Sequence, residues 1–246
     1  MRDYKVETQK RVEFIKQQIE ESKTKGIVFG HSGGKDSVLV GILCKMACED
    51  TVGLIMPCST KVNYEDDLTD AMMISKLYLI EKRMVDLTKT AEALKKALKD
   101  ACDINNSANA NVAIAPRLRM TALYAVASSE NRLVAGTGNK SERYMGYFTK
   151  WGDGAYDFNP IADLTVTEIY EFLHHLDVPK RIIDKAPSGG LFDGQTDEKE
   201  MGITYKAIDE YLQSGKSSPE DIEIIKRYHK ISEHKRNPPK IYEGNH

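Results

Sequence analysis

The chain has 246 residues, which fits one large α/β domain or a domain with a helical appendage and allows a substantial core. Hydrophobic residues make up 41% of the chain and charged residues 29%, the ordinary balance of a soluble globular protein. The formal net charge is −2, from 35 basic and 37 acidic side chains, so no overall positive field favours nucleic acid as a partner.

Apolar runs and amphipathic stretches alternate along the first 135 residues. Residues 4–24 carry apolar side chains among charges at helical spacing, and this predicted helix ends near Gly26. Residues 105–111 are polar and typical of a turn. Further helices are expected at 38–46, 64–77, 88–99 and 117–130, and strands at 27–29, 52–56, 82–87 and 132–135. Strands that alternate with helices in this way indicate a parallel sheet covered on both faces.

The segment Gly30–Ser37, with the sequence Gly-His-Ser-Gly-Gly-Lys-Asp-Ser, joins a predicted strand to a predicted helix. Its two adjacent glycines let the backbone approach a ligand, and their N–H groups lie at the positive end of the helix dipole. Serine hydroxyls and Lys35 add donors and a positive charge, so the segment is suited to phosphate. A nucleoside-triphosphatase loop is excluded because Asp36 follows Gly-Lys, and the glycine spacing of the dinucleotide fingerprint is absent.

What remains resembles the Ser-Gly-Gly-x-Asp-Ser loop of the ATP pyrophosphatases, which cleave ATP between its α and β phosphates. Asp36 is then expected to bind Mg²⁺, which prefers a carboxylate together with phosphate oxygens and water. The alternative is a glycine-rich turn that only connects a strand to a helix. Ligands of parallel sheets bind beyond the carboxyl ends of the strands, and a second turn, residues 136–142, follows another predicted strand. The two turns could therefore face one ligand from two sides.

Three later segments could also belong to a binding site. Residues 136–142 contain hydroxyls, a lysine and Glu142, a pattern that an ordinary helix cap would also give. Residues 145–163 are rich in aromatic residues and glycine, typical either of a loop that stacks flat rings or of a packed connection. Residues 187–198 are rich in turn residues and could form a lid. The last stretch, 232–246, is basic and contains proline, so a mobile tail or lid is expected there.

The order of motifs along the chain resembles that of the ammonia-dependent NAD synthetases, from about residue 10 to about residue 235. The motifs that carry the resemblance lie at 117–120, 136–142, 145–150, 152–155, 159–164, 187–188 and 194–198. This resemblance implies an adenine-nucleotide α-hydrolase-like fold, a three-layer α/β/α sandwich around a parallel sheet, formed by residues 1–246 as a single domain. It also implies a homodimer with deamido-NAD bound near the subunit interface.

The resemblance carries roles to individual residues of this chain. ATP would be held by the whole of Gly30–Ser37 and by two further hydroxyl residues, and deamido-NAD would be held by a separate set. The expected ATP contacts are Gly30, His31, Ser32, Gly33, Gly34, Lys35, Asp36, Ser37, Thr137 and Ser188. The expected deamido-NAD contacts are Arg117, Lys150, Asp157, His234 and Lys235, and the expected Mg²⁺ ligands are Asp36 and Glu142. Val166 stands where the family usually has a lysine, and Lys185 is a candidate substitute for that phosphate contact.

The implied reaction is the amidation of deamido-NAD to NAD through an acyl-adenylate formed from ATP, with AMP and pyrophosphate as products. Free ammonia is expected as the nitrogen donor, because the resemblance begins almost at the N-terminus and leaves no room for a glutamine-hydrolysing domain. No serine–histidine or cysteine–histidine nucleophile is assigned, and Asp153 and Asp157 are candidates for orienting ammonia or for hydrogen bonding to substrate or loop. Three alternatives are open. A tRNA-thiolating ATP pyrophosphatase would need RNA-binding surface and usually paired reactive cysteines, and a GMP-synthetase-like amidotransferase module should lack the 145–163 segment. A non-enzymatic nucleotide-binding module should not cleave ATP, and the carboxylates Asp36 and Glu142 argue against it.

The cysteines and the N-terminus bear on this choice. Cys44, Cys48, Cys58 and Cys102 form no Cys-x-x-Cys pair, and Cys44 and Cys48 lie one helical turn apart in an apolar stretch typical of buried packing. No signal-peptide core and no apolar run of membrane-spanning length occur in the chain. We therefore expect a cytoplasmic enzyme without a nucleic-acid or membrane partner.

Overall fold

A four-stranded parallel sheet forms the centre of the protein in the computed structural model, which describes residues 2–58, 64–103, 108–185 and 196–243. The strands are β1 (Gly26–Gly30), β2 (Thr51–Ile55), β3 (Glu81–Met84) and β4 (Arg132–Ala135), in the order β3-β2-β1-β4. The register places Val28 of the central strand beside Val52 and Val134. The predicted α/β sandwich with a parallel sheet is therefore confirmed, and the four predicted strands form it.

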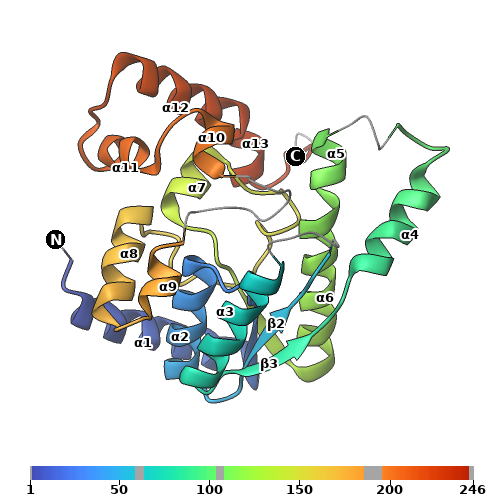
Figure 1. Ribbon diagram of the computed structural model, residues 1–246, viewed down its shortest axis with the longest axis vertical. Helices are drawn as coiled ribbons and strands as arrows, with labels where there is room; N and C mark the ends of the chain where they lie inside the picture. The colour runs from blue at the N-terminus through green and yellow to red at the C-terminus, as the bar shows by residue number, and fades with distance from the viewer. Residues whose placement is uncertain (1, 59–63, 104–107, 186–195, 244–246) are drawn as a thin grey trace.

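Helices cover both faces of the sheet, because successive side chains of β1 point to opposite faces and all of them are apolar. Ile27 and Phe29 pack into one core with residues of α1 (Tyr4–Ser22), α2 (Lys35–Ala47) and α3 (Tyr64–Leu77), and α8 (Val166–His175) and α9 (Lys180–Ile183) complete this layer. Val28 points the other way, into a core with α4 (Thr88–Leu98) and α6 (Ile114–Glu130). The result is the predicted three-layer arrangement (Figure 1).

The turn predicted at residues 105–111 lies outside the described residues for 105–107 and is wrong for 108–111. Ala108–Val112 form a short helix, α5, directly before α6. Two alanines, which favour helix, and the apolar residues that follow outweigh the polar composition of this segment. The other predicted helices are present, with ends within a few residues of the expected positions.

The four C-terminal helices gather with α7 at one end of the described part of the molecule (top of Figure 1). They are α7 (Lys140–Met145), α10 (Asp197–Met201), α11 (Tyr205–Ser214), α12 (Pro219–Ile231) and α13 (Glu233–Arg236). Their shared core contains Met145, Ile208 and Ile225, each almost fully buried, and also Val166 at the start of α8. The beginning of the predicted tail is packed here, since the Ser232 hydroxyl and the Arg236 guanidinium both bond to carbonyl oxygens of this region. In the described part of the chain, no helix combines the length and apolarity needed to cross a membrane.

Candidate active site

The segment Gly30–Ser37 leaves β1 at the carboxyl edge of the sheet and enters the first turn of α2. The Ser32 and Ser37 hydroxyls lie 3.0 Å apart, and the Gly34 N–H donates to the Ser32 hydroxyl at 3.2 Å. The Ser37 hydroxyl lies 2.9 Å from the Gly34 carbonyl oxygen, to which it can donate. These bonds fold the segment into a compact turn at the N-terminus of a 13-residue helix, where backbone N–H groups and the helix dipole favour an anion.

The turn rests against α3, and this contact explains why Gly33 is a glycine. Its φ is +78°, in the left-handed region, and an added Cβ atom would lie 2.6 Å from the Asp67 carbonyl oxygen. His31 makes the second contact, since its Nε2 lies 3.0 Å from the Ala71 carbonyl oxygen. Its side chain is 1% exposed, and burial lowers the pKa of His31 to about 4. His31 is therefore neutral and buried, so only its backbone could contact a nucleotide.

Asn139 brings the two predicted metal ligands together. Its Nδ2 donates to the Asp36 carboxylate at 3.1 Å, and its backbone N–H donates to the Glu142 carboxylate at 3.0 Å. Its Oδ1 in turn accepts from the Glu142 N–H at 2.9 Å, which completes a capping box at the start of α7. The alternative of an ordinary helix cap is thus true of the local structure. The cap residue Asn139, however, also bonds to Asp36, which lies 103 residues earlier in the sequence, and so joins Asp36 to Glu142.

Lys35 places a positive charge against this acidic pair. Its Nζ lies 3.0 Å from an Asp36 oxygen, and the residue is 6% exposed. Burial alone would lower the pKa of Lys35, but the carboxylates of Asp36 and Glu142 outweigh it and raise the pKa above its usual value. Burial and the Asp36 charge raise the pKa of Glu142 well above the ordinary carboxyl range, and Lys35 opposes this shift. An additional cation beside the two carboxyl groups would oppose this shift and favour the ionised form of Glu142.

The donor set suits Mg²⁺. Asp36 and Glu142 supply hard carboxylate oxygens, and Mg²⁺ usually takes one or two carboxylates with substrate phosphates and water. Within the described ranges, no group of three or more His, Cys, Asp or Glu side chains is spaced to hold a metal ion. The residues present therefore fit an ion shared with a nucleotide better than an ion in an all-protein cage.

The sequence did not single out Tyr205, which covers this pair from the C-terminal helices. The Lys35 Nζ lies 6.0 Å from the centroid of the Tyr205 ring, and the Tyr205 hydroxyl donates to Asp197 at 2.9 Å. The Tyr205 N–H donates to Glu198 at 2.7 Å. Asp197 and Glu198 fall in the Gln-Thr-Asp-Glu motif, so that motif was the available signal, although no local pattern pointed to Tyr205 as its partner.

Four of the five predicted deamido-NAD residues lie around the aromatic loop that follows α7. Arg117 donates to the Lys150 carbonyl oxygen at 3.3 Å, and the Lys150 ammonium donates to the His234 carbonyl oxygen at 2.6 Å. The Lys235 ammonium donates to the carbonyl oxygens of Gly146 and Phe148, both at 2.8 Å, which fixes the start of the C-terminal segment to the loop. Trp151 beside them is 55% exposed, so its ring is accessible to a ligand.

Asp157 has a different local role. One of its oxygens accepts from the Val134 N–H at 2.7 Å, and the other accepts from the Tyr124 hydroxyl at 3.2 Å. It therefore satisfies a backbone donor of the edge strand β4. Among the remaining predicted residues, Thr137 is partly buried between β4 and α7, and Ser188 lies outside the described residues.

Val166 is 3% exposed and belongs to the core of the C-terminal helices, so its place in this chain is apolar packing. Lys185, the candidate substitute, binds Asp67 at 2.5 Å and Asp70 at 2.8 Å. Asp70 is almost fully buried and also binds Arg181 at 2.5 Å. These ion pairs tie α9 and the residues directly after it to the same stretch of α3 on which the phosphate-type turn rests.

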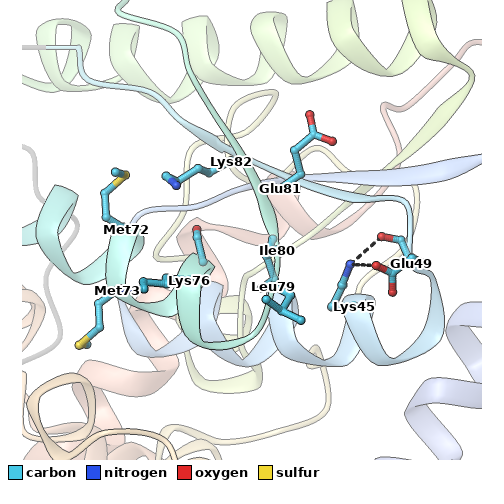
Figure 2. Close-up of a pocket in the computed structure, with 10 residues that line it drawn as sticks. Lys45, Glu49, Met72, Met73, Lys76, Leu79, Ile80, Glu81 and Lys82 are labelled. Carbon is cyan, nitrogen blue, oxygen red and sulfur yellow. Dashed lines mark hydrogen bonds and ion pairs between the residues drawn. The ribbon is translucent and has the colours of Figure 1, made fainter.

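A surface pocket away from these residues lies between the C-terminal ends of α2 and α3 and the start of β3 (Figure 2). Its lining includes Met72, Leu79 and Lys82, and the Lys45 ammonium beside it is paired with Glu49 at 2.5 Å. Helix ends and strand starts of this kind form the amino edge of a parallel sheet, whereas the turn at Gly30–Ser37 lies at the carboxyl edge. We therefore place the chemistry at the carboxyl edge, where the charged groups converge.

A parallel sheet with a Ser-Gly-Gly-x-Asp-Ser turn at its carboxyl edge and an acidic pair beside that turn is the arrangement of an ATP pyrophosphatase. The NAD synthase family model matches residues 7–239, and the chain belongs to this family. An NH(3)-dependent NAD(+) synthetase of Carboxydothermus hydrogenoformans is 45% identical over 240 residues, which cover 97% of this chain and 98% of that protein. The expected enzyme class, an ammonia-dependent NAD synthetase, is thereby confirmed, and a tRNA-thiolating enzyme is not favoured.

Two solved structures extend the comparison. The NMN synthetase of Francisella tularensis is 36% identical, with a TM-score of 0.92 over 98% of this chain and 99% of that one. The NH3-dependent NAD synthetase of Campylobacter jejuni is 31% identical, with a TM-score of 0.80 over 99% of this chain and all of that one. Both match the chain from end to end, and the names of the two enzymes refer to different products.

Proposed function

We propose that this protein converts deamido-NAD to NAD with ammonia and ATP, with AMP and pyrophosphate as the other products. The observation that carries the proposal is the convergence of the Gly30–Ser37 turn with Asp36, Glu142 and Lys35 in a chain of the NAD synthase family. A carboxylate oxygen is a poor leaving group, so the nicotinate carboxylate must be activated before ammonia can replace it. ATP supplies that activation.

The first step forms a bond between a nicotinate carboxylate oxygen and the α-phosphorus of ATP, and the bond from that phosphorus to pyrophosphate breaks. In the second step the ammonia lone pair attacks the acyl carbon, AMP leaves, and one proton is released. The chain's part in the first step is to bind and orient the phosphates with the N–H groups of the turn, the hydroxyls of Ser32 and Ser37, and Lys35. Asp36 and Glu142 would hold Mg²⁺, which would neutralise charge on the phosphate oxygens.

The deamido-NAD would lie along the aromatic loop, against Arg117, Lys150, His234 and Lys235. Their side chains and backbone already contact one another there, and the exposed Trp151 ring offers a stacking surface. We place Thr137 and Ser188 with the ATP contacts and Asp157 with the dinucleotide contacts, on the strength of the motifs alone. The enzyme is proposed to be a cytoplasmic homodimer with the dinucleotide near the subunit interface, a groove that suits an extended ligand.

Product identification tests this proposal directly. The full chain is incubated with ATP, Mg²⁺, ammonium chloride and deamido-NAD, and the nucleotides are separated and identified. NAD, AMP and pyrophosphate in equal amounts are expected, whereas ADP and phosphate would reject an ATP pyrophosphatase. A parallel reaction with nicotinate mononucleotide in place of deamido-NAD tests a second candidate substrate, favoured by the TM-score of 0.92 to an NMN synthetase. A higher kcat/KM for the mononucleotide would transfer the proposal to that substrate.

A further inference from the structure

Arg119 presents unused hydrogen-bond donors at the carboxyl edge of the sheet. Its Nε donates to the Met56 carbonyl oxygen at 3.0 Å, and Met56 directly follows β2. A guanidinium has five N–H donors. Among the described residues, the Arg119 side chain makes no hydrogen bond other than the one from its Nε to Met56. The N–H donors of its two terminal nitrogens are therefore left for a ligand.

The start of the phosphate-type turn lies next to Arg119. An added Cβ atom at Gly30 would lie 3.6 Å from Met56 Cε and 3.9 Å from Leu123 Cδ1. Leu123 is four residues after Arg119 on α6, hence one helical turn further along the same face. The helix connects to β4 at its C-terminal end, so its N-terminal turns lie above the carboxyl edge of the sheet. Arg119 therefore lies one turn above Gly30, on the side where ligands of parallel sheets bind.

Among the described residues, no carboxylate lies close enough to Arg119 to form an ion pair with it, and Asp153 and Asp67 attract its charge only from a greater distance. Burial lowers the pKa of Arg119, and the attraction of Cys58, Asp153 and Asp67 offsets this only in part. An arginine remains protonated despite such a shift. A buried guanidinium whose charge is only partly compensated destabilises the ligand-free protein, and an anion placed beside it would remove that penalty.

We infer that Arg119 binds an oxyanion of the reacting pair, either a phosphate of ATP or the carboxylate of deamido-NAD. The inference rests on the proposed function, because that reaction brings both anions to this edge of the sheet. A planar guanidinium matches either group, since both present two oxygens at the spacing of its N–H fork. Arg119 would thus act separately from Arg117, which is exposed and donates to the Lys150 carbonyl oxygen.

Titration calorimetry of the full chain tests this inference. Wild type, Arg119→Met, Arg119→Lys and the exposed charge control Arg227→Gln are each titrated with MgATP alone and with deamido-NAD alone. Loss of a charge-assisted contact in Arg119→Met should weaken one of the two ligands by on the order of 10- to 100-fold. Arg119→Lys should fall in between, because it keeps the charge and loses the fork. Weaker MgATP binding identifies the phosphate as the partner, and weaker deamido-NAD binding identifies the carboxylate.

Thermal unfolding without ligand separates binding from a structural role. Arg119→Met should be as stable as wild type or more stable, because a residue kept for ligand binding is not optimised for stability. Unchanged affinity for both ligands in Arg119→Met, or a lower Tm with unchanged affinities, would overturn the inference while wild type still binds both. A wild-type chain that binds neither ligand would overturn the proposed function itself.

Discussion

Replacing Asn139 by aspartate should destabilise the protein strongly at neutral pH and much less at acid pH. Aspartate caps a helix as well as asparagine does, so the Glu142 N–H keeps its acceptor. In the wild type, the Asn139 Nδ2 donates to Asp36 at 3.1 Å, and the residue is 0% exposed. The substitution puts a carboxylate oxygen in place of this donor. Two unit charges at that distance repel by about 5 kcal/mol for an effective dielectric constant near 20.

Proton uptake limits this cost. If either of the two facing carboxyl groups takes up a proton, the repulsion between charges disappears. Holding a proton on a carboxyl group with a pKa near 4 costs about 1.36 kcal/mol for each pH unit above that pKa. The cost is therefore about 4 kcal/mol at pH 7 and about 1 kcal/mol at pH 5. The repulsion raises a carboxyl pKa in the folded state only, so stability is lost as the pH rises through that interval. Urea unfolding of Asn139→Asp should therefore show a deficit of about 4 kcal/mol at pH 7 that shrinks to about 1 kcal/mol at pH 5.

The capping box at Thr165 and Glu168 supplies the matched control. Thr165→Asp places a carboxylate in the same local setting, 1% exposed in the wild type, but without Asp36 beside it. Its deficit should be smaller at pH 7. Equal deficits for Asn139→Asp and Thr165→Asp at pH 7, or a deficit for Asn139→Asp that does not change between pH 7 and pH 5, would refute the reasoning.

Three further predictions follow from the site. Burial lowers the folded-state pKa of His31 to about 4, which gives about 3 kcal/mol of folding stability that is fully present above pH 6.5 and is lost as the pH falls toward 4. The free energy of unfolding of His31→Leu should therefore depend less on acid pH than that of wild type. Gly33→Ala should weaken MgATP binding at least about tenfold in calorimetry, because the new methyl meets the backbone of α3, whereas Gly202→Ala, with a φ of +72° and nothing within 4 Å, should bind MgATP like wild type. Asp36→Asn and Glu142→Gln should each raise the Mg²⁺ concentration needed for half-maximal turnover, and wild-type rates at limiting Mg²⁺ in either variant would remove that residue from the ion's ligands.

The parts of the structure that could be predicted are those that residues adjacent in the sequence determine. The turn at Gly30–Ser37 and the apolar strands are specified by consecutive side chains, so pattern and motif located them. The polar composition around α5 gave a wrong prediction of a turn at residues 108–111, because alanine propensity and the adjoining helix outweighed it.

Contacts between distant segments could not be predicted in this way. The bond from Asn139 to Asp36 and the cation–π contact of Lys35 with Tyr205 depend on how α7 and α11 are packed. The burial of Val166 likewise depends on helices that follow it by more than thirty residues. Motif matching recognised the carboxylates of the site, and only the folded chain shows which donors hold them.

Oxygen isotope transfer tests the central claim, activation of the carboxylate as an acyl-adenylate. Deamido-NAD labelled with ¹⁸O in both carboxylate oxygens is incubated with the full chain, ATP, Mg²⁺ and ammonia, and the products are analysed by mass spectrometry. One ¹⁸O should appear in AMP and one should remain in the carboxamide of NAD, because the attacking oxygen leaves with the α-phosphate. Unlabelled AMP, or ¹⁸O in pyrophosphate or free phosphate, would contradict the account.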